Sequence, residues 1–234
     1  MPLLQRFQTE QAVMMGRLIG WCDKTFNAGR NKRQMGVMTI AALCIAVAVL
    51  GWLITLIPGT FIDIIVVAIL LAQKSLVEHV QAVGDALRLS LADGRKSVAM
   101  IVGRDTRDMD GPAVARSAIE STAENLSDGV IAPIFWFAVA GLPGLLVYKI
   151  TNTADSMIGY RTPKHAEFGW AAARFDDLLN LIPARLTALL IWAVTGRPAP
   201  RPILQEAPQH RSPNAGWPEA AMAGALDIRL SGPR

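Results

Sequence analysis

Residues 36–57 read GVMTIAALCIAVAVLGWLITLI, and this stretch decides the fold class because it contains no charged side chain. About 20 apolar residues in a helix are enough to cross the hydrocarbon core of a bilayer. A helix is also the form in which a single segment satisfies its own backbone hydrogen bonds in lipid. The stretch therefore predicts a membrane-spanning helix and, with it, an all-α, polytopic integral membrane protein.

Basic residues gather ahead of this stretch. The first 35 residues contain the acids Glu10 and Asp23 against a larger set of bases: Arg6, Arg17, Lys24, Arg30, Lys32 and Arg33. The positive-inside rule then predicts a cytoplasmic N-terminus. The apolar stretch begins too late and is too long for a cleaved signal peptide. We therefore expect a multi-pass protein of the inner (plasma) membrane.

The composition agrees with a membrane location. Hydrophobic residues make up 52% of the chain and the mean hydropathy is +0.32, whereas soluble domains contain about 45–50% apolar residues. The net charge of +4 suits either a nucleic acid or an anionic leaflet. Because the bases lie beside an apolar stretch and not along a groove interleaved with aromatic residues, the predicted partner is the lipid bilayer and not a nucleic acid.

Further apolar segments follow along the chain. Residues 60–72 come after a Pro-Gly turn and predict a short returning helix, so that residues 36–72 form a transmembrane hairpin. Residues 131–150 are interrupted by prolines and glycines, and such broken segments tend to line buried or aqueous cavities. Residues 181–194 are apolar but short for a full span.

The chain is therefore expected to consist of five parts, with an amphipathic, membrane-proximal region inserted between apolar ones. These parts are a basic cytoplasmic segment (1–35), the hairpin (36–72), a polar helical region (73–130), broken apolar segments with interfacial polar motifs (131–195), and a Pro-rich loop with a short C-terminal helix (196–234). Residues 98–103, VAMIVG, are typical of a short strand. The prolines of residues 196–218 are too dense for a helix. The active-site region is expected at the cytoplasmic face.

An amphipathic helix carries the acids that indicate chemistry. Pro112 suits the first turn of a helix, and a rotation of 100° per residue then places Glu120, Glu124 and Asp128 on one face, opposite an apolar one. One interpretation is a solvated face with an Arg116–Glu120 ion pair. The other is a site at which a cation relieves the repulsion between like charges. Both interpretations stay open on spacing alone.

Two further polar clusters flank the later apolar segments. Asn152 and Asp155 share a helical face directly after one apolar segment, where a polar face is costly unless it has a partner. The next apolar segment is introduced by a second set: Arg174, Asp176, Asp177, Asn180 and Arg185. Oxygen ligands at this density suit Mg²⁺ with a phosphorylated substrate, and the arginines suit phosphate or carboxylate groups. Ion pairs that join helices are the alternative.

The cysteines and histidines indicate no metal site. Cys22 lies in the basic segment and Cys44 in the first span, so they are not a metal-binding or disulfide pair. The histidines, His79, His165 and His210, lack the spacing of an HExxH motif and are interpreted as isolated surface or loop imidazoles.

Several long motifs together resemble one known family: VGRDTRDMD, AIESTAENLSDGVIAPIFW, YKITNTADSMIGYRTPKHAEFGWAAARFDDLLNLIPARLTALL and SPNAGWPEAAMAGAL. They are similar to the CobD/CbiB family of cobalamin biosynthesis, the adenosylcobinamide-phosphate synthases, over residues 13–234. The resemblance implies an ATP-dependent membrane ligase that joins aminopropanol, or its phosphate, to adenosylcobyric acid by an amide bond. Corrinoid, ATP and Mg²⁺ are then the expected ligands, with other enzymes of the cobalamin pathway as candidate partners.

The resemblance also implies roles for individual residues. The expected catalytic set is Glu120, Glu124, Asp128, Asp155 and Asp177, and its members Glu124, Asp128 and Asp155 are the candidate Mg²⁺ ligands. The expected substrate-binding set is Arg104, Asp105, Asn125, Asn152, Tyr160, Arg174, Asp176, Arg185, Ser212, Asn214 and Glu219. Amide synthesis needs an activated acyl group, and Mg²⁺ and basic side chains would hold the charge that develops on it.

The chain departs from the family pattern at both ends. Glu10-Gln11 stand where the family has a His-Pro pair behind an additional hydrophobic segment, and the chain stops at LSGPR. Both ends are therefore expected to be truncated. The sequence holds no GxxxxGK[ST] phosphate loop, so ATP would bind by another geometry. The rival function is a non-catalytic membrane sensor or regulator, or a subunit that presents a corrinoid to a partner enzyme.

Overall fold

The computed structural model is all-helical over the residues that it describes, which are 3–59, 61–71, 73–103, 105–196 and 200–230. Within these ranges no strand occurs, so the all-α prediction is confirmed. The helices form two compact units. The first unit joins residues 1–71 to residues 132–180, and the second joins residues 72–131 to residues 181–234.

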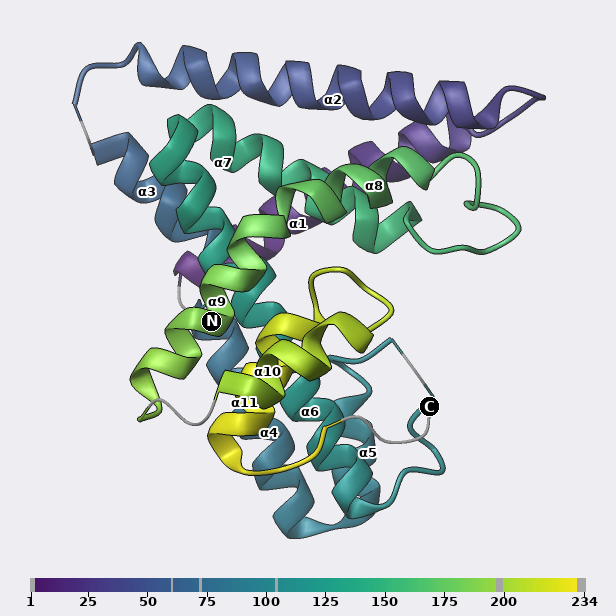
Figure 1. The fold of residues 1–234 in the computed structure, drawn as a ribbon. Helices are drawn as coiled ribbons and strands as arrows, with labels where there is room; N and C mark the ends of the chain where they lie inside the picture. Colours follow the sequence, from purple (N-terminus) through teal and green to yellow (C-terminus); the bar gives the residue numbers. More distant parts are fainter. Residues whose placement is uncertain (1–2, 60, 72, 104, 197–199, 231–234) are drawn as a thin grey trace. The chain divides into compact units, whose positions relative to one another are not determined.

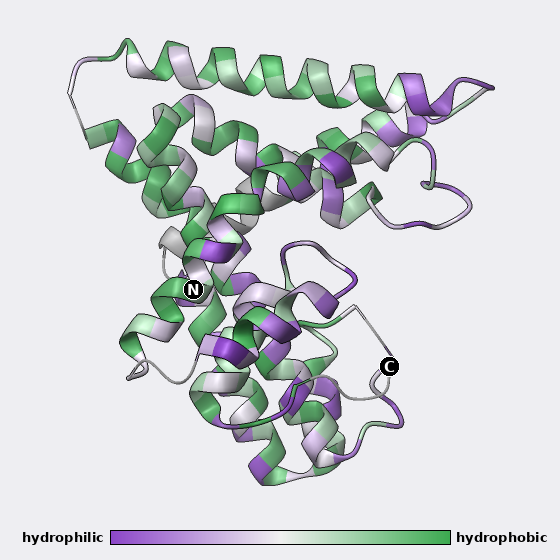
Figure 2. Ribbon diagram, in the orientation of Figure 1, coloured by the Kyte–Doolittle hydropathy of each residue, from purple (hydrophilic) through white to green (hydrophobic). Residues whose placement is uncertain are grey.

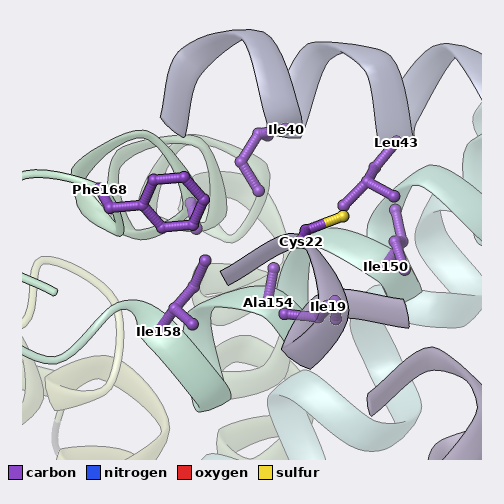
Figure 3. Close-up of a cluster of buried hydrophobic side chains, with 9 residues drawn as sticks. Ile19, Cys22, Ile40, Leu43, Ile150, Ala154, Ile158 and Phe168 are labelled. Atoms are coloured by element: carbon purple, nitrogen blue, oxygen red, sulfur yellow. The ribbon is translucent and has the colours of Figure 1, made fainter. Parts of the chain in front are cut away.

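Helix α7 (Ala132–Ile158) is the centre of the first unit. It packs against α1 (Leu3–Phe26), α2 (Lys32–Thr55), α3 (Phe61–Leu70) and α8 (Trp170–Leu179), as Figure 1 shows. Figure 3 shows how apolar side chains from α1, α2 and α7 meet in one core: Ile19, Cys22, Ile40, Leu43, Ile150, Ala154 and Ile158, closed by Phe168. Cys22 and Cys44 are both free thiols, as predicted.

Helix α2 confirms the membrane-spanning prediction. It is apolar around its whole circumference, and its hydrophilic residues gather at its beginning (Figure 2). Large apolar side chains such as Met38 (63% exposed) and Ile45 (66% exposed) face outward, where a helix of a soluble protein would carry polar residues. Lys32–Thr55 and Gly111–Ile158 are each long and apolar enough to cross a membrane. If α8 and α9 (Leu181–Val194) are counted together as one broken span, they add a third.

Helix α7 is interrupted where the sequence predicts a break. Ala140 (φ −137°) and Gly141 (φ 61°, ψ −154°) leave helical geometry, and Pro143 follows inside the helix. A left-handed φ suits glycine, which has no Cβ to clash. Gly51 of α2 packs directly on this break, because a Cβ there would lie 2.7 Å from the Pro143 backbone nitrogen. Glycine therefore allows α2 and α7 to approach closely.

The second unit consists of shorter helices. They are α4 (Gln73–Leu89), α5 (Leu91–Val98), α6 (Gly111–Leu126), the π-helical turn η1 (Ser127–Ile131), α9, α10 (Pro200–Glu206), the 3₁₀ turn η2 (Ala207–Gln209) and α11 (Gly216–Leu226). One core lies among α4, α5 and α6 and contains Val83, Val98, Val114 and Ala118. A second core lies among α9, α10, η2 and α11 and contains Ala188, Ile191, Ile203, Ala207, Ala220 and Ala221.

Local signals explain where two of these helices begin. The Asp110 side chain accepts a hydrogen bond from the Ala113 N–H at 2.7 Å, and Pro112 occupies the first turn of α6, as predicted. The Ser90 side chain caps α5 in the same way by accepting from the Asp93 N–H. These caps satisfy backbone donors that the helix itself leaves without a partner.

Two local predictions are wrong. Residues 98–103 form no strand, because Val98 ends α5 and the following residues continue as hydrogen-bonded turns. The Pro-rich segment also contains a helix, α10, which begins at Pro200 and has Pro202 in its first turn. Proline is tolerated there, because the first turn of a helix has no use for its missing N–H.

Candidate functional site

The acidic face of α6 is divided between interior and solvent. Glu120 is buried (6% exposed), whereas Glu124 is exposed and Asp128 is half-buried. Asp128 lies in the π-helical turn η1, so the regular 100° rotation that aligns it with Glu120 and Glu124 ends before it. A π-helical turn often marks a functional site. Of the three acids, Glu120 is the one that is largely removed from solvent.

Polar groups beside Glu120 are held by hydrogen bonds. The buried Ser121 hydroxyl donates to the Ile101 carbonyl at 2.9 Å, and the Asn125 side-chain amide donates to the Ser121 carbonyl at 2.8 Å. The predicted apolar face is thus correct for Ala118 and Ala123, but Ser117 and Ser121 are buried as well. This side of α6 is an ordered polar interior, which the amphipathic pattern alone does not indicate.

A buried carboxylate dominates the site in the first unit. Asp176 of α8 is 8% exposed, and its two oxygens accept hydrogen bonds from the side-chain amides of Asn152 (3.3 Å) and Asn180 (3.0 Å). The carboxylate of Asp155 lies close enough for its charge to act on Asp176. A buried carboxylate is costly unless it is paired or binds a cation. Asn152, Asp155 and Asp176, which the sequence places in two clusters, therefore meet in one place.

Tyr148 extends this network and was missed by the sequence reasoning. Its side chain is fully buried, and its hydroxyl donates to the Asn180 side-chain oxygen at 3.1 Å. That oxygen accepts from Tyr148 while the amide nitrogen of Asn180 donates to Asp176, so the network fixes the orientation of Asn180. The sequence does contain one indication of this contact, a tyrosine inside an apolar run, because a buried phenol needs a hydrogen-bond partner.

Gly159 fixes the position of Asp155 at the end of α7. Its N–H donates to the Asp155 carbonyl at 2.7 Å, and a Cβ at this position would collide with Asp155 Oδ1. The carboxylate therefore rests directly on the glycine backbone. A side chain at residue 159 would displace it.

Other predicted residues of this unit lie at the surface. Arg174 and Asp177 form an ion pair on α8 at 3.4 Å, with more than half of the Arg174 side chain exposed, and Tyr160 is 61% exposed. Arg174 and Tyr160 do not belong to the buried network and are accessible to a solute. Asp177 is half-buried, and its charge acts on Asp176.

The segment that precedes α6 carries an exposed ion pair. Asp105 accepts hydrogen bonds from the Arg107 guanidinium, which lowers the pKa of Asp105 to about 2. Arg104, a predicted phosphate contact, lies outside the described residues. Asp105 is thus ionised at neutral pH and has a cationic neighbour.

Predicted residues of the second unit gather around the start of α11. Arg185 of α9 lies over the Trp217 ring at 4.7 Å and donates to the Asn214 side-chain oxygen at 3.5 Å. The Ser212 hydroxyl accepts from the Asn214 N–H at 3.3 Å. Arg185, Ser212 and Asn214 therefore form one connected polar group.

The interpretation of the histidines as isolated imidazoles is wrong for two of them. His165 Nε2 lies 3.3 Å from the buried carboxylate of Asp23, and His210 Nε2 lies 3.7 Å from the buried carboxylate of Glu219. His165 and Asp23 are 142 positions apart and His210 and Glu219 are nine apart, so a search for motifs of the HExxH type detects neither pair. His79 is exposed and interacts with Ser75, one turn away on the same helix.

The proposed metal set is distributed over the two units. Asp155 belongs to the first unit, and Glu124 and Asp128 belong to the second. In the described ranges, no group of three or more His, Cys, Asp or Glu side chains is arranged to hold a metal ion. The convergence of these three carboxylates stays a prediction.

Comparisons with known proteins agree with one another. Residues 9–234 match the family described as CobD/Cbib protein. The cobalamin biosynthesis protein CobD of Sinorhizobium fredii (strain NBRC 101917 / NGR234) is 50% identical over 244 residues, covering 97% of this chain and 75% of that protein. The protein of the same description from Brucella suis biovar 1 (strain 1330) is 48% identical, covering 100% and 77%. That of Rhodobacter capsulatus is 51% identical, covering 94% and 73%. No solved structure matches.

Proposed function

The chain belongs to the CobD/Cbib family of cobalamin biosynthesis proteins, and from this premise we propose that it is an ATP-dependent amide ligase. The reaction joins aminopropanol, or its phosphate, to the free carboxyl group of adenosylcobyric acid. The carboxylate must first become an activated acyl group, such as an acyl phosphate. The amine then attacks the acyl carbon and phosphate leaves, which gives the amide.

The observation that carries this proposal is the buried carboxylate of Asp176. It lies beside Asp155 and is held by amide donors from Asn152 and Asn180. The amides of Asn152 and Asn180 donate hydrogen bonds to this carboxylate but carry no opposite charge. Burying such an acid costs stability, and its presence favours a role in binding or catalysis.

The residues around Asp176 suit Mg²⁺. This ion commonly binds through one or two carboxylates together with substrate phosphates, and Asp155 and Asp176 supply two adjacent carboxylates. When bound, Mg²⁺ with ATP would supply the phosphoryl group and neutralise the charge on it.

The chain's own side chains would bind and orient the reactants. Asn152 and Asn180 hold the Asp176 carboxylate in a fixed orientation, which lowers the cost of ordering it during the reaction. Arg174 is exposed beside Asp177, where its guanidinium suits a phosphate or a corrinoid carboxylate. We propose the cytoplasmic face for this region; the positive-inside rule favours that side for the basic segment before the first span.

The proposal is tested with membranes that contain the chain. They are supplied with adenosylcobyric acid, aminopropanol phosphate, ATP and Mg²⁺, and the corrinoid products are separated by mass. We expect a product with the mass of the amide. Asp176→Asn keeps the shape of the side chain and removes its charge, and it should lower the rate by about 100-fold or more.

A matched variant controls for non-specific effects. Asp108→Asn makes the same substitution at an exposed residue and should leave the rate unchanged. If Asp176→Asn forms product at the full rate, the assignment of Asp176 is wrong. If the chain with its natural residues binds the corrinoid yet forms no amide, a presenting subunit or a regulator is the better description.

A further inference from the structure

The second unit contains a small apolar groove between α9, α10 and α11. Its volume is about 330 Å³, at the lower end of the range for small-molecule sites, about 300–1,000 Å³. The lining includes Ala188 and Ile203, which are buried, and Leu189 and Leu204, which are 54% and 59% exposed. The groove therefore has an apolar floor in the core of this unit and an apolar rim that is open to its surroundings.

Arg185 brings a positive charge to this groove. Its guanidinium lies over the Trp217 ring at 4.7 Å, and Nη1 donates to the Leu181 carbonyl at 2.7 Å and to the Asn214 side-chain oxygen at 3.5 Å. These acceptors are neutral, so they hold the guanidinium without cancelling its charge. Both hydrogen bonds start at Nη1, and the opposite edge of a guanidinium, Nε with Nη2, can bind a phosphate through two parallel hydrogen bonds.

Helix α9 also carries exposed apolar residues outside the groove. Ile182 is 61% exposed, Leu190 41% and Val194 80%, and Figure 2 shows α9 as largely hydrophobic. Exposed apolar surface of this kind marks contact with a membrane or a protein, and α9 together with α8 is a candidate broken membrane span. Two half-buried tryptophans, Trp192 and Trp217, line the groove, and tryptophan is enriched at the level of lipid headgroups.

The size and the charge of the groove select its occupant. One turn of a partner helix, about 10 Å wide and 5.4 Å long, occupies about 400 Å³, so the groove suits a slender chain better than a second protein segment. An uncharged hydrocarbon would leave the guanidinium without a counter-ion, and a small soluble anion would gain nothing from the apolar walls. A molecule with an acyl chain and an anionic headgroup matches both features.

We propose that this groove binds an acyl chain of an anionic phospholipid of the bilayer. Leu189 and Leu204 flank the chain, and Arg185 binds the headgroup phosphate. Trp217 and Asn214 are positioning residues, because they hold the guanidinium. A zwitterionic headgroup binds more weakly, because its cation is repelled by Arg185. This inference does not rest on the proposed ligase reaction, since neither corrinoid nor ATP takes part in it.

The test is photo-crosslinking of the purified full chain in nanodiscs. The nanodisc lipid is phosphatidylcholine with a small fraction of a phosphatidylglycerol probe that carries a diazirine in one acyl chain, and labelled peptides are identified by mass spectrometry. We expect the labelling of the groove peptides to saturate as the probe fraction rises, whereas the labelling of α2 rises in proportion. A phosphatidylcholine probe with the same diazirine should label the groove about five-fold less.

Variants assign the two ends of the lipid. Arg185→Gln should reduce labelling by the phosphatidylglycerol probe to the level of the phosphatidylcholine probe, and Arg201→Gln on α10, outside the groove lining, is its matched control. Leu189→Trp fills the groove and should remove most of the labelling by either probe. Leu190→Trp makes the same change at the neighbouring residue, which does not line the groove, and should leave the labelling unchanged. If Leu189→Trp does not fold, Leu204→Trp repeats the test from the other side of the groove.

Four results contradict the proposal. Labelling of the groove that does not saturate would show only the lipid that surrounds any membrane helix. Equal labelling by the two probes, or full labelling of a folded Leu189→Trp protein, would remove the headgroup contact or the groove from the account. Oleic acid that competes as well as unlabelled phosphatidylglycerol would identify a fatty-acid site. An unlabelled groove that crosslinks to a second copy of the chain would identify a protein interface.

Discussion

Replacing Asp23 by Asn should loosen the connection between the two helices that carry Asp155 and Asp176. Asp23 is buried near the end of α1 and binds the segment between α7 and α8, through Lys164 and His165. Asn27 also donates to it, at 2.8 Å. The substitution keeps an acceptor but removes the charge from these three hydrogen bonds.

The size of the effect follows from those contacts. A hydrogen bond to a charged group contributes about 1.5–3 kcal/mol, and much of the Lys164 side chain remains in solvent. We therefore expect Asp23→Asn to lower the free energy of unfolding by about 2 kcal/mol, which corresponds to roughly 4–8 °C in Tm for a chain of this size. The assay is thermal unfolding of the purified protein in lipid nanodiscs, followed by the fluorescence of its tryptophans.

The pH dependence tests the cause. Burial acts to raise the pKa of Asp23, but hydrogen bonds from Lys164, Asn27 and His165 outweigh it, so the pKa lies below its ordinary value of 3.8. A carboxyl group whose pKa is lowered by folding stabilises the folded state at pH values above its ordinary pKa. This stabilisation is lost as the pH falls through the lowered pKa. The Tm difference between the natural protein and Asp23→Asn should thus be full at pH 7 and shrink below about pH 4.

A surface pair provides the control. Asp85 and Arg88 form an ion pair at 2.7 Å in which both side chains are more than 70% exposed. Asp85→Asn should change Tm by no more than about 1–2 °C, because exposed pairs contribute little. The reasoning is refuted if Asp23→Asn and Asp85→Asn have equal effects, or if the effect of Asp23→Asn is the same at pH 3.5 and pH 7.

Two further substitutions test the buried network. Tyr148→Phe removes the donor to Asn180 and should destabilise the protein by about 1–3 kcal/mol; an unchanged Tm would show that this hydrogen bond contributes nothing. Gly159→Ala places a methyl group against Asp155 and should lower both ligase activity and Tm. Gly84→Ala is its control, since a Cβ there would meet nothing within 4 Å beyond its chain neighbours and its own helix backbone, and it should not reduce Tm.

The sequence predicts the membrane helices well because their signals are local. The uncharged run of α2 and the Gly141–Pro143 break in α7 each depend on a few adjacent residues and on the chemistry of lipid. Asp110 and Pro112 likewise specify the start of α6 within one turn. The rule that dense prolines exclude a helix fails for α10, because Pro200 and Pro202 lie in its first turn, where proline is tolerated.

The candidate site is less predictable because it depends on long-range contacts. The pattern identifies Asn152 and Asp176 as polar groups at an interface, but their hydrogen bond spans 24 positions. The pairing of His165 with Asp23, 142 positions away, is equally invisible to local motifs. The π-helical turn at Asp128 also ends the regular rotation on which the acidic face was predicted. The expected meeting of Glu124 with Asp155 stays a prediction.

A scan of all single substitutions in helix α2 should show a characteristic pattern of tolerated and rejected residues. Its buried positions are Gly36, Thr39, Ile40, Leu43 and Gly51; Met35, Cys44, Val47 and Ile54 are partly buried against the cores, and most of its other positions face outward. On the outward side, selection acts only on solubility in hydrocarbon, so leucine, isoleucine, valine and phenylalanine should be interchangeable and only charges rejected. On the buried side, size itself is constrained, and even alanine should be rejected at Gly51. Among natural relatives, most of this helix should therefore drift freely in sequence while one narrow stripe stays unchanged.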